Sequence, residues 1–478
     1  MNPALSQVVD EVLKQVVPSS EEREHVRAVT ELVRTLVVDE ADRTGLNIAV
    51  EVGGSVAKDT WLSEDVDIDL FMLFPTDISK KELGELGLAI AKRAFSGHKQ
   101  RERYAEHAYL EAWVNGIRVN IVPCYRTSRG HWLSAADRSP YHTRYVVEKL
   151  RAERLNDDVR LFKKFAKGIG AYGAEIRVGG LSGYLCELLI LHYGSFPKAL
   201  EAISRWRFGE VIDPEKLYKG RVEDVRRLFS EPLIVIDPVD QNRNVAAAVS
   251  RNRMSELIAA TRFFLEKPST IFFYPEDAEA TQEDLRKIFS SLEYDVIAIE
   301  VRTGEEVPDI LWGELLKTQS ALRHLLEAND FIVLQSDVWS DEVESSVMIF
   351  ALETKILSKC KRHLGPPGDT DGVVPFLEKR AVEVVAGSWV ERGRWIVGLK
   401  RRYTSAESLL EDKLSNGGRG IGVSRGLVEA LASSRLLVGV EVLSLFGKEG
   451  FAQFLTRFLK GGPRWLPRHS SSSSGLSC

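Results

Sequence analysis

The chain has 478 residues, of which 44% are hydrophobic and 28% are charged, and its formal net charge is −5 at pH 7. This composition is typical of a soluble globular protein, and the length allows roughly two to four domains. No run approaches the roughly 18 apolar residues of a membrane span, which excludes a helical membrane protein. The net charge does not indicate nucleic-acid binding, although a basic face can coexist with acidic surfaces elsewhere.

Cysteine usage favours a reducing compartment. Four cysteines, Cys124, Cys186, Cys360 and Cys478, form no Cys-x-x-Cys pair, so neither a zinc site nor a disulfide framework is expected. The amphipathic, acidic N-terminal stretch does not read as a signal peptide. We therefore expect a cytoplasmic protein without a membrane partner.

The first clear element is a helix that begins near residue 19. Ser19 and Glu22 have the spacing of a capping box, in which each side chain bonds the other residue's backbone N–H. The helical pattern runs to about Thr44 and ends at Gly45, a residue typical of helix C-termini.

A glycine-rich turn follows the next predicted strand, residues 46–52. It consists of Gly53, Gly54 and Ser55, and glycine lets the backbone approach a ligand closely. Residues 56–62 read as a short helix. Its free N–H groups and positive dipole end would face a phosphate.

Two aspartates one residue apart, Asp67 and Asp69, lie in the apolar strand predicted over residues 66–74. Side chains alternate faces along a strand, so both point the same way. Two carboxylates on one face repel each other unless a cation neutralises them. Mg²⁺ or Mn²⁺ prefers such oxygen ligands and binds substrate phosphates. The order of strand, Gly-Gly-Ser turn, helix and Asp-x-Asp strand predicts a nucleotide-and-metal site.

The remaining elements follow from periodicity and turn residues. Asn115-Gly116, between strand-like runs at 107–114 and 117–124, is a strong hairpin signal. We predict further helices over 80–95, 143–155, 157–168, 183–193, 244–265 and 308–326. We predict further strands over 270–274, 296–301, 331–339 and 347–352. Residues 365–368 predict a loop, and the serine run at 470–474 predicts disorder.

Several short segments, dense between residues 50 and 250, form a specific set: Gly54–Leu62, Asp67–Asp69, Tyr104–His107, Val122–Tyr125, Asp137–His142, Tyr172–Glu175, Ser182–Leu189, Asp237–Asp240 and Arg243–Ala247. In these segments the chain resembles the archaeal-type (class I) CCA-adding enzymes, which are tRNA nucleotidyltransferases of the polymerase-β-like superfamily. Beyond residue 270 the resemblance is looser.

The resemblance implies an α+β multidomain fold. Residues 1–142 would form a polymerase-β-like nucleotidyltransferase head, a mixed sheet with helices, and residues 143–268 a helical neck. Residues 269–465 would form α/β body and tail domains that bind tRNA, and residues 466–478 a disordered tail. The implied activity is template-independent addition of CCA to the 3′ end of tRNA from CTP and ATP, with Mg²⁺ or Mn²⁺ as cofactor. The partner would be the tRNA acceptor arm, and a homodimer is left open.

The resemblance also assigns roles to single residues. Nucleotide contacts would come from Gly54, Ser55, Lys58, His107, His142, Lys163, Tyr172 and Arg243. Alternative interpretations remain for several of them. Lys163 lies in a basic helical stretch that could be a solvated face, and the two histidines could be structural. Arg243 could simply pair with Asp237 or Asp240.

One position departs from the family pattern. The third metal-binding carboxylate corresponds to Asn120, whose amide can ligate a metal but carries no charge and cannot accept the proton of the attacking hydroxyl. A two-residue turn at Asn115-Gly116 would place Glu111 opposite Asn120, with Cβ atoms roughly 4.5–5.5 Å apart. Glu111 then either supplies the missing carboxylate or only hydrogen-bonds Asn120. The candidate metal ligands are therefore Asp67 and Asp69, with Glu111 or Asn120.

Basic residues in the C-terminal half are candidate tRNA phosphate contacts, although such clusters are often merely solvated. They are Lys359, Lys361, Arg362, Arg392, Arg394, Lys400, Arg401 and Arg402. Two classes of function remain: an active CCA-adding enzyme, or a catalytically impaired tRNA-binding homologue that lacks one metal carboxylate. The motif set disfavours a third possibility, another terminal nucleotidyltransferase such as a poly(A) polymerase.

Overall fold

The structure is a computed structural model that describes residues 3–63, 65–104, 108–276, 280–304 and 306–466. The chain divides into two compact units, one of residues 1–276 with 463–478 and one of residues 277–462. Two predictions, the contact from His107 and the disorder of the serine run, lie outside the described residues. No helix in the described ranges is long and apolar enough to cross a membrane.

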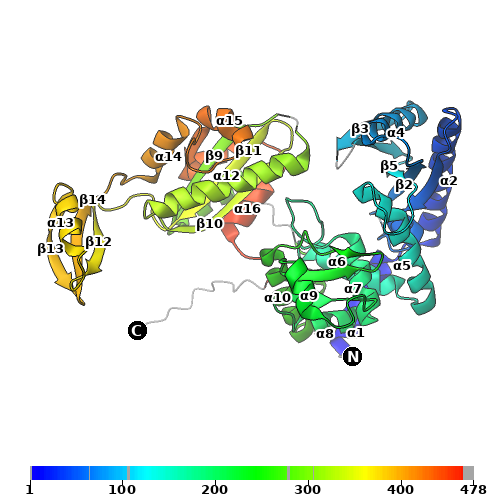
Figure 1. The fold of residues 1–478 in the computed structure, drawn as a ribbon, viewed down its shortest axis with the longest axis horizontal. Helices are drawn as coiled ribbons and strands as arrows, with labels where there is room; N and C mark the ends of the chain where they lie inside the picture. Colours follow the sequence, from blue (N-terminus) through cyan, green and yellow to red (C-terminus); the bar gives the residue numbers. More distant parts are fainter. Residues whose placement is uncertain (1–2, 64, 105–107, 277–279, 305, 467–478) are drawn as a thin grey trace. The chain divides into compact units, whose positions relative to one another are not determined.

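The first unit contains a mixed five-stranded sheet in the order β1-β2-β5-β4-β3 (Figure 1). Its strands are β1 (Ala49–Gly53), β2 (Asp67–Phe74), β3 (Lys99–Tyr104), β4 (Ala108–Val114) and β5 (Ile117–Tyr125). Helices α2 (Ser20–Asp42) and α4 (Lys80–Ala94) begin at capping boxes, as predicted for α2. Their apolar sides pack with alternate residues of β2, from Ile68 to Phe74. The other face of β2, which carries both aspartates, is therefore directed away from these helices.

The hairpin at Asn115-Gly116 confirms the predicted register. Val114 pairs with Ile117, and Glu111 pairs with Asn120 across β4 and β5. Both turn residues have positive φ, 49° at Asn115 and 82° at Gly116, as a tight hairpin turn requires. The neighbouring parallel pairing of β2 with β5 places Asp69 beside Asn120. Local turn chemistry thus determines which side chains meet on this sheet.

Helices form most of the remainder of the first unit. They are α1 (Pro3–Val16), α5 (Ser139–Glu153), α6 (Asn156–Gly168), α7 (Gly183–Tyr193), α8 (Phe196–Ile203), α9 (Val222–Leu228) and α10 (Arg251–Glu266). A cluster of packed aromatic rings, including Phe165, Phe196 and Phe264, lies between them. A small sheet, β6 (Glu210–Ile212), β7 (Leu233–Asp237) and β8 (Asp240–Asn244), was not predicted.

Two predictions are wrong in this region. The helix predicted from residue 244 begins only at Arg251, because Asn244 ends β8 and Ser250 caps the helix. The strand predicted over residues 270–274 is a short 3-10 turn, Thr270–Phe272, capped by Ser269. The apolar side chains that suggested a strand pack instead into the aromatic cluster around Phe165.

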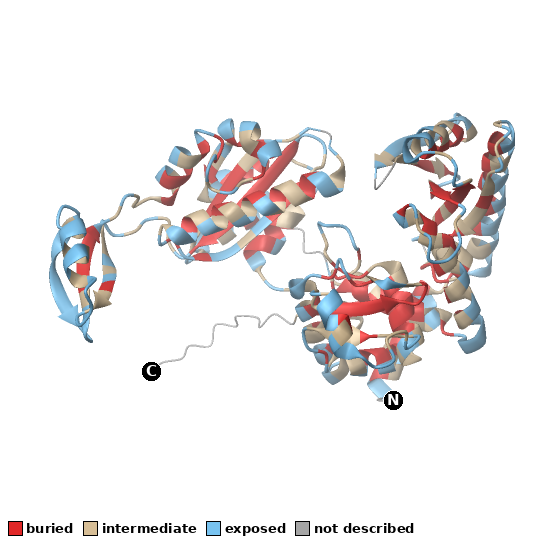
Figure 2. Ribbon diagram, in the orientation of Figure 1, coloured by how far each residue is buried: buried red, intermediate tan, exposed pale blue. Residues whose placement is uncertain are grey.

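The second unit contains an antiparallel sheet in the order β10-β11-β9-β15. Its strands are β9 (Asp295–Arg302), β10 (Val333–Ser340), β11 (Ser345–Leu352) and β15 (Arg435–Val438). Helices α12 (Pro308–Ala328), α14 (Ala406–Leu414) and α15 (Val428–Ala432) pack on one face, and α11 (Gln282–Ser291) and α16 (Phe451–Lys460) on the other. Strand β11 is buried along its whole length, as Figure 2 shows. Its uninterrupted apolar run reflects this cover on both faces.

A second, smaller sheet lies between β11 and α14 in the sequence. It consists of β12 (Cys360–Pro367), β14 (Arg394–Lys400) and β13 (Val384–Glu391), with α13 (Val373–Arg380) against it. The loop predicted over residues 365–368 is wrong for most of its length, because β12 continues to Pro367. An irregularity between Leu364 and Pro367 accommodates the proline in the strand.

Candidate functional site

The two aspartates of β2 share one face of the sheet, as predicted, and Asn120 of β5 lies against both. Its amide nitrogen is 2.9 Å from Oδ1 of Asp69 and 3.5 Å from Oδ2 of Asp67. Arg118, also on β5, donates a hydrogen bond of 3.0 Å to Oδ2 of Asp67. Parallel pairing of β2 with β5 brings these four side chains together.

The negative charge of Asp67 disfavours the ionisation of Asp69. Burial and the neighbouring charge of Asp67 raise the pKa of Asp69 to about 6, although the hydrogen bond from Asn120 acts in the opposite direction. A divalent cation would remove this conflict, and its preference for oxygen ligands matches the pair. In the described part of the chain, no three or more His, Cys, Asp and Glu side chains gather as a metal-binding group. Asp67 and Asp69, on one face of β2, fit a cation held by two carboxylates.

Gly54 lets the backbone reach this pair. It begins α3 (Gly54–Lys58) at φ +63°, and a Cβ on it would lie 1.8 Å from Oδ2 of Asp69. Only glycine fits this position, because the backbone lies close to the Asp69 carboxylate; the predicted close approach of this turn to a ligand stays a prediction. Helix α3 is shorter than the predicted 56–62, because Asp59 adopts a left-handed conformation at φ 53° and ends it. Ser55 lies in its single turn.

Glu111 faces the site but is held by another side chain. It pairs with Asn120 in the strand register and is buried. Its Oε2 accepts a 2.8 Å hydrogen bond from Nε of Arg103. Among the described residues its hydrogen-bond partner is thus Arg103 and not Asn120, and its role as a compensating carboxylate stays a prediction.

Two buried lysines meet on one carboxylate. The ammonium of Lys58 lies 2.8 Å from Oε2 of Glu187, and that of Lys163 lies 2.9 Å from Oε1. Thr60 donates a 2.7 Å hydrogen bond to Oε1 of the same glutamate. Burial alone would raise the pKa of Glu187, but Lys163 and Lys58 lower it to about 2. Lys163 is only 3% exposed, so its interpretation as a solvated residue is wrong.

Tyr172 lies close to these lysines. Its hydroxyl and the Lys163 ammonium would lie 3.0 and 3.7 Å from a Cβ on Gly183, the first residue of α7. Burial raises the pKa of Tyr172 well above its ordinary value, so the phenol stays protonated and can donate a hydrogen bond.

A second buried carboxylate, Asp237, gathers the other predicted nucleotide contacts. Nε2 of His142 and Nη1 of Arg243 each lie 2.8 Å from its Oδ2. The hydroxyl of Tyr184 lies 3.1 Å from Oδ1, and the Tyr184 and His142 rings stack at 4.0 Å. The interpretation that Arg243 pairs with Asp237 is therefore confirmed, whereas Asp240 pairs with Arg138.

The pKa values of His142 and Asp237 indicate their charge states at pH 7. Burial lowers the pKa of His142 despite its contact with Asp237, so the imidazole is neutral at pH 7. Burial alone would raise the pKa of Asp237, but hydrogen bonds from His142, Val239 N–H and Arg243 lower it to about 2. A neutral His142 that donates through Nε2 leaves Nδ1 as an acceptor. Glu187 and Asp237 were both missed as site residues, although each is an acid inside an apolar run.

The predicted basic residues of the second unit differ in their surroundings. Arg401 forms an ion pair with Asp330, which also binds Lys361 at 3.0 Å. Arg402 is exposed and lies over the Tyr403 ring, 5.1 Å from its centre. The other candidates include Arg362, paired with Glu391, and Arg394, bonded to the Gly365 carbonyl.

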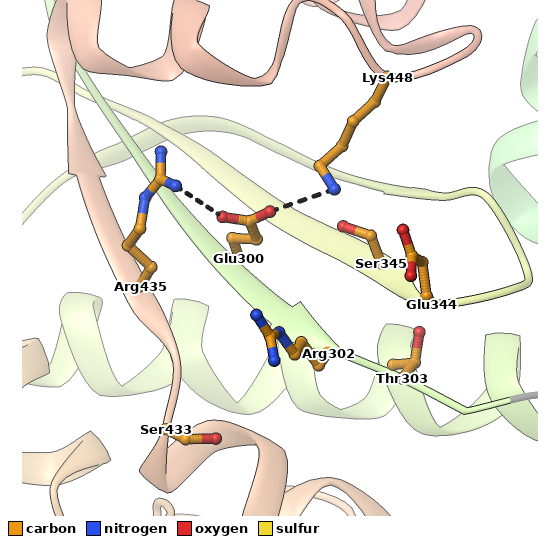
Figure 3. Close-up of a pocket in the computed structure, with 8 residues that line it drawn as sticks. All are labelled: Glu300, Arg302, Thr303, Glu344, Ser345, Ser433, Arg435 and Lys448. Atoms are coloured by element: carbon orange, nitrogen blue, oxygen red, sulfur yellow. Dashed lines mark ion pairs between the residues drawn. The ribbon is translucent and has the colours of Figure 1, made fainter.

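A cavity of about 680 Å³ in the second unit also carries basic side chains, none of them predicted (Figure 3). Arg435 and Lys448 each lie 3.4 Å from Glu300, and Arg302 lines the same cavity. The buried hydroxyl of Ser345 in its wall has no hydrogen-bond partner among the described residues.

The comparisons with known proteins agree with this arrangement. Residues 35–152 match the model of the nucleotidyltransferase domain, and residues 157–274 match the model described as "tRNA nucleotidyltransferase, second domain". With its Gly-Gly-Ser turn and Asp-x-Asp strand on a mixed sheet, the first unit defines the protein as a polymerase-β-like nucleotidyltransferase. Residues 294–433 match "CCA-adding enzyme, C-terminal domain".

Relatives that match nearly the whole chain identify its family within this class of nucleotidyltransferases. The CCA-adding enzyme of Methanopyrus kandleri is 38% identical over 96% of this chain and 98% of its own length. That of Methanothermobacter thermautotrophicus is 37% identical over 94% and 97%. The chain belongs to the family of CCA-adding enzymes, whose members are metal-dependent nucleotidyltransferases. Among solved structures, a Cid1 poly(U) polymerase is similar over 57% of this chain and 99% of its own, with a TM-score of 0.44 and 14% identity.

Proposed function

We propose that this protein adds C, C and A to the 3′ end of tRNA from CTP and ATP, without a nucleic-acid template. The observation that carries the proposal is the Asp67–Asp69 pair on one strand face, reached by the backbone of Gly54. Family membership over nearly the whole chain supports the same activity.

The reaction forms a bond between the tRNA 3′-oxygen and the α-phosphorus of the nucleotide and breaks the bond to the β-phosphate, so pyrophosphate leaves. A bound Mg²⁺ or Mn²⁺ would neutralise the phosphate charge and lower the pKa of the attacking hydroxyl. Asp67 and Asp69 would hold it, whereas neutral Asn120 adds no charge and accepts no proton. Positioning by the remaining side chains supplies much of the rate.

The nucleotide would lie between the two groups of buried side chains. Lys58, Lys163 and Tyr172 would bind the triphosphate, with Ser55 and Gly54 beside it. His142 and Arg243 would contact the nucleoside. Lys58 offers a point charge suited to a phosphate that must later leave as pyrophosphate.

The proposal extends to domains and partners. Residues 1–142 would act as the catalytic head, 143–268 as the neck, and 269–465 as the body and tail that bind the tRNA acceptor arm. Cysteine usage favours the cytoplasm, and the oligomeric state, with a homodimer as one outcome, can be measured by light scattering. The relatives are CCA-adding enzymes and give no support to the alternative of an impaired homologue, and the substitution tests on Asn120 address it directly.

The test is nucleotide addition itself. A tRNA transcript that lacks CCA is incubated with the protein, Mg²⁺ and labelled CTP and ATP, and the 3′ ends are sequenced. We expect CCA ends from the wild type, and none from Asp67→Ala or Asp69→Ala, whereas gel-shift affinity for tRNA stays unchanged. Uridine or poly(A) tails would identify another terminal transferase, and tRNA binding without addition would identify the impaired homologue.

A further inference from the structure

Glu187 has no role in the chemistry above, yet it organises the triphosphate side of the site. It is the acidic residue of α7, whose other buried positions are apolar or cysteine, and it is 1% exposed. A charged group in such a place is costly unless it is paired and hydrogen-bonded. Its partners are side chains from other segments: Lys58 and Thr60, 129 and 127 positions away, and Lys163 of α6. Glu187 therefore links the segment that follows the Gly-Gly-Ser turn, residues 58–60, to helices α6 and α7.

The charge balance of this cluster indicates an anionic ligand. Two ammonium groups share one carboxylate, and Lys58, Lys163 and Glu187 are 8%, 3% and 1% exposed. These three side chains therefore carry one more positive than negative charge, and the further acid that Lys58 faces, Asp69, is one of the two carboxylates proposed to hold the cation. A phosphate group supplies the missing negative charge.

Hydrogen-bond counting separates the two lysines. An ammonium has three donors. Those of Lys163 have three acceptors within the protein: Glu187, the Thr60 hydroxyl at 2.9 Å and the Thr60 carbonyl at 3.3 Å. Among the described residues, Lys58 has Glu187 as its hydrogen-bond acceptor, which leaves two N–H groups for a phosphate. Lys58 can thus donate directly to a phosphate. Lys163 can donate to a phosphate only by giving up its longest hydrogen bond, the one to the Thr60 carbonyl.

We propose that Glu187 is a positioning residue of the nucleotide site, which aims Lys58 and Lys163 at the triphosphate. This inference rests on the proposed function for the identity of the anion. Without the carboxylate the two ammonium groups would repel each other in a buried site, and one would lose its proton more readily. Glu187→Gln should therefore weaken nucleotide binding, and more so as the pH rises.

The other titratable groups that face this cluster are shared by the wild type and the Glu187 variants, so the difference between their pH profiles isolates the effect of Glu187. Asp69, with a pKa of about 6, completes its ionisation in all of them. These groups are Asp69 and His142 toward Lys58, the Tyr184 ring beside Lys58, and Cys186, Tyr172 and Lys167 toward Lys163. Burial raises the pKa of Cys186, Tyr172 and Tyr184 and lowers the pKa of His142, so these four stay neutral between pH 7 and 9. A larger rise in Kd over this range in Glu187→Gln than in the wild type would thus report the two lysines.

The experiment measures CTP binding by calorimetry with Mg²⁺ and no tRNA, and KM and kcat for CTP on tRNA, at pH 7 and pH 9. For Glu187→Gln we expect Kd and KM to rise roughly ten- to a hundredfold, the effect of losing one hydrogen bond to a charged group. The increase should be larger at pH 9, with a smaller change in kcat. Glu187→Asp keeps the charge and should restore most of the binding and the flat pH profile.

A matched control is Asp137→Asn, which removes another buried carboxylate that accepts backbone hydrogen bonds from Tyr125, Leu133 and Ser134. It should lower thermal stability without changing the Kd for CTP or its pH profile. If Glu187→Gln does not fold, Thr60→Val removes the hydroxyl between Glu187 and Lys163 and should weaken CTP binding in the same direction.

Two results would overturn the inference: wild-type CTP binding by Glu187→Gln at both pH values, or equal losses in Glu187→Gln and Glu187→Asp without pH dependence. The second pattern would mean that Glu187 only supports the fold. Failure of the proposed function is a separate outcome, in which the wild type binds CTP but does not extend tRNA.

Discussion

The amide nitrogen of Asn120 lies 2.9 Å from Oδ1 of Asp69 and donates a hydrogen bond to that carboxylate. A donor aimed at a carboxylate competes with a cation for the same lone pairs. The family pattern places a third carboxylate at this position, which would attract the cation instead. We therefore expect Asn120 to weaken cation binding at the proposed site in two ways, by supplying no charge and by occupying an oxygen of Asp69.

We therefore predict that Asn120→Asp raises the rate of nucleotide addition or lowers the Mg²⁺ concentration needed for half-maximal rate. The expected gain is roughly tenfold or more, about 1.4 kcal/mol of barrier for each factor of ten. Single-turnover rates across a Mg²⁺ titration measure it. Asn120→Ala is the control, because it removes the donor without adding charge. An unchanged rate in Asn120→Asp would show that this position contributes no metal ligand.

Glu111 provides the second half of that test. Its carboxylate is bound by Arg103 at 2.8 Å, so we expect Glu111→Gln to lower stability, because Glu111 is buried, but to leave the rate within about twofold of the wild type. Were Glu111 the compensating carboxylate, Glu111→Gln would be severely impaired alone and mildly impaired when combined with Asn120→Asp. Measuring the four combinations of these two substitutions distinguishes the cases.

Alanine substitutions at Gly54 and Gly45 separate the effect of displacing Asp69 from the effect of backbone strain. A Cβ at Gly54 would lie 1.8 Å from Oδ2 of Asp69, whereas one at Gly45 meets no atom within 4 Å. Both glycines have positive φ, +63° and +71°, so the backbone strain of alanine at either position costs about 1 kcal/mol of stability, and the clash at Gly54 adds to that cost. Gly54→Ala should also lower the addition rate by roughly a hundredfold, because it displaces the metal-binding carboxylate. Thermal melts and rates of the two variants check this, and equal rates would contradict it.

Much of this site follows from local rules. The alternation of β2 places Asp67 and Asp69 on one face, and the two-residue turn at Asn115-Gly116 fixes Glu111 opposite Asn120. Glu187 could not be found in this way, because its partners are far away in the sequence and its own neighbours are apolar. For Asp237 the nearby partner Arg243 was considered, but its contacts with His142 and Tyr184, which are distant in the sequence, could not be predicted. The strand predicted over residues 270–274 is also wrong because of distant contacts: packing against the aromatic cluster around Phe165 overrides the local strand pattern.

The lowered pKa of Asp237 predicts how the free energy of unfolding depends on pH. Burial would raise the pKa of Asp237, but hydrogen bonds from His142, the Val239 N–H and Arg243 hold its folded-state pKa at about 2, below the ordinary value of 3.8. Its contribution is therefore complete above about pH 4 and is lost as the pH falls toward 2. By linkage the shift corresponds to roughly 2 kcal/mol. We expect Asp237→Asn to be less stable than the wild type at pH 7 and to lose less stability between pH 5 and pH 2.5.

Urea unfolding at a series of pH values measures this difference. Asp224→Asn is the control, because Asp224 is an exposed partner of Arg221 at 3.4 Å and such surface pairs contribute little. Parallel curves for the wild type and Asp237→Asn would show that the carboxylate gains nothing from its partners in the fold.

The basic residues Arg401 and Arg402 lead to opposite expectations. The Arg401 side chain is 15% exposed and paired with Asp330, so its substitution should mainly reduce stability. Arg402 is exposed beside Tyr403 and is free to meet a phosphate. We expect Arg402→Glu to weaken tRNA binding uniformly across tRNA species and to reduce the slope of log affinity against log salt by about one. Filter binding at several salt concentrations measures both quantities. Arg401→Ala should leave that slope unchanged, and an unchanged slope in Arg402→Glu would exclude this surface from the tRNA contact.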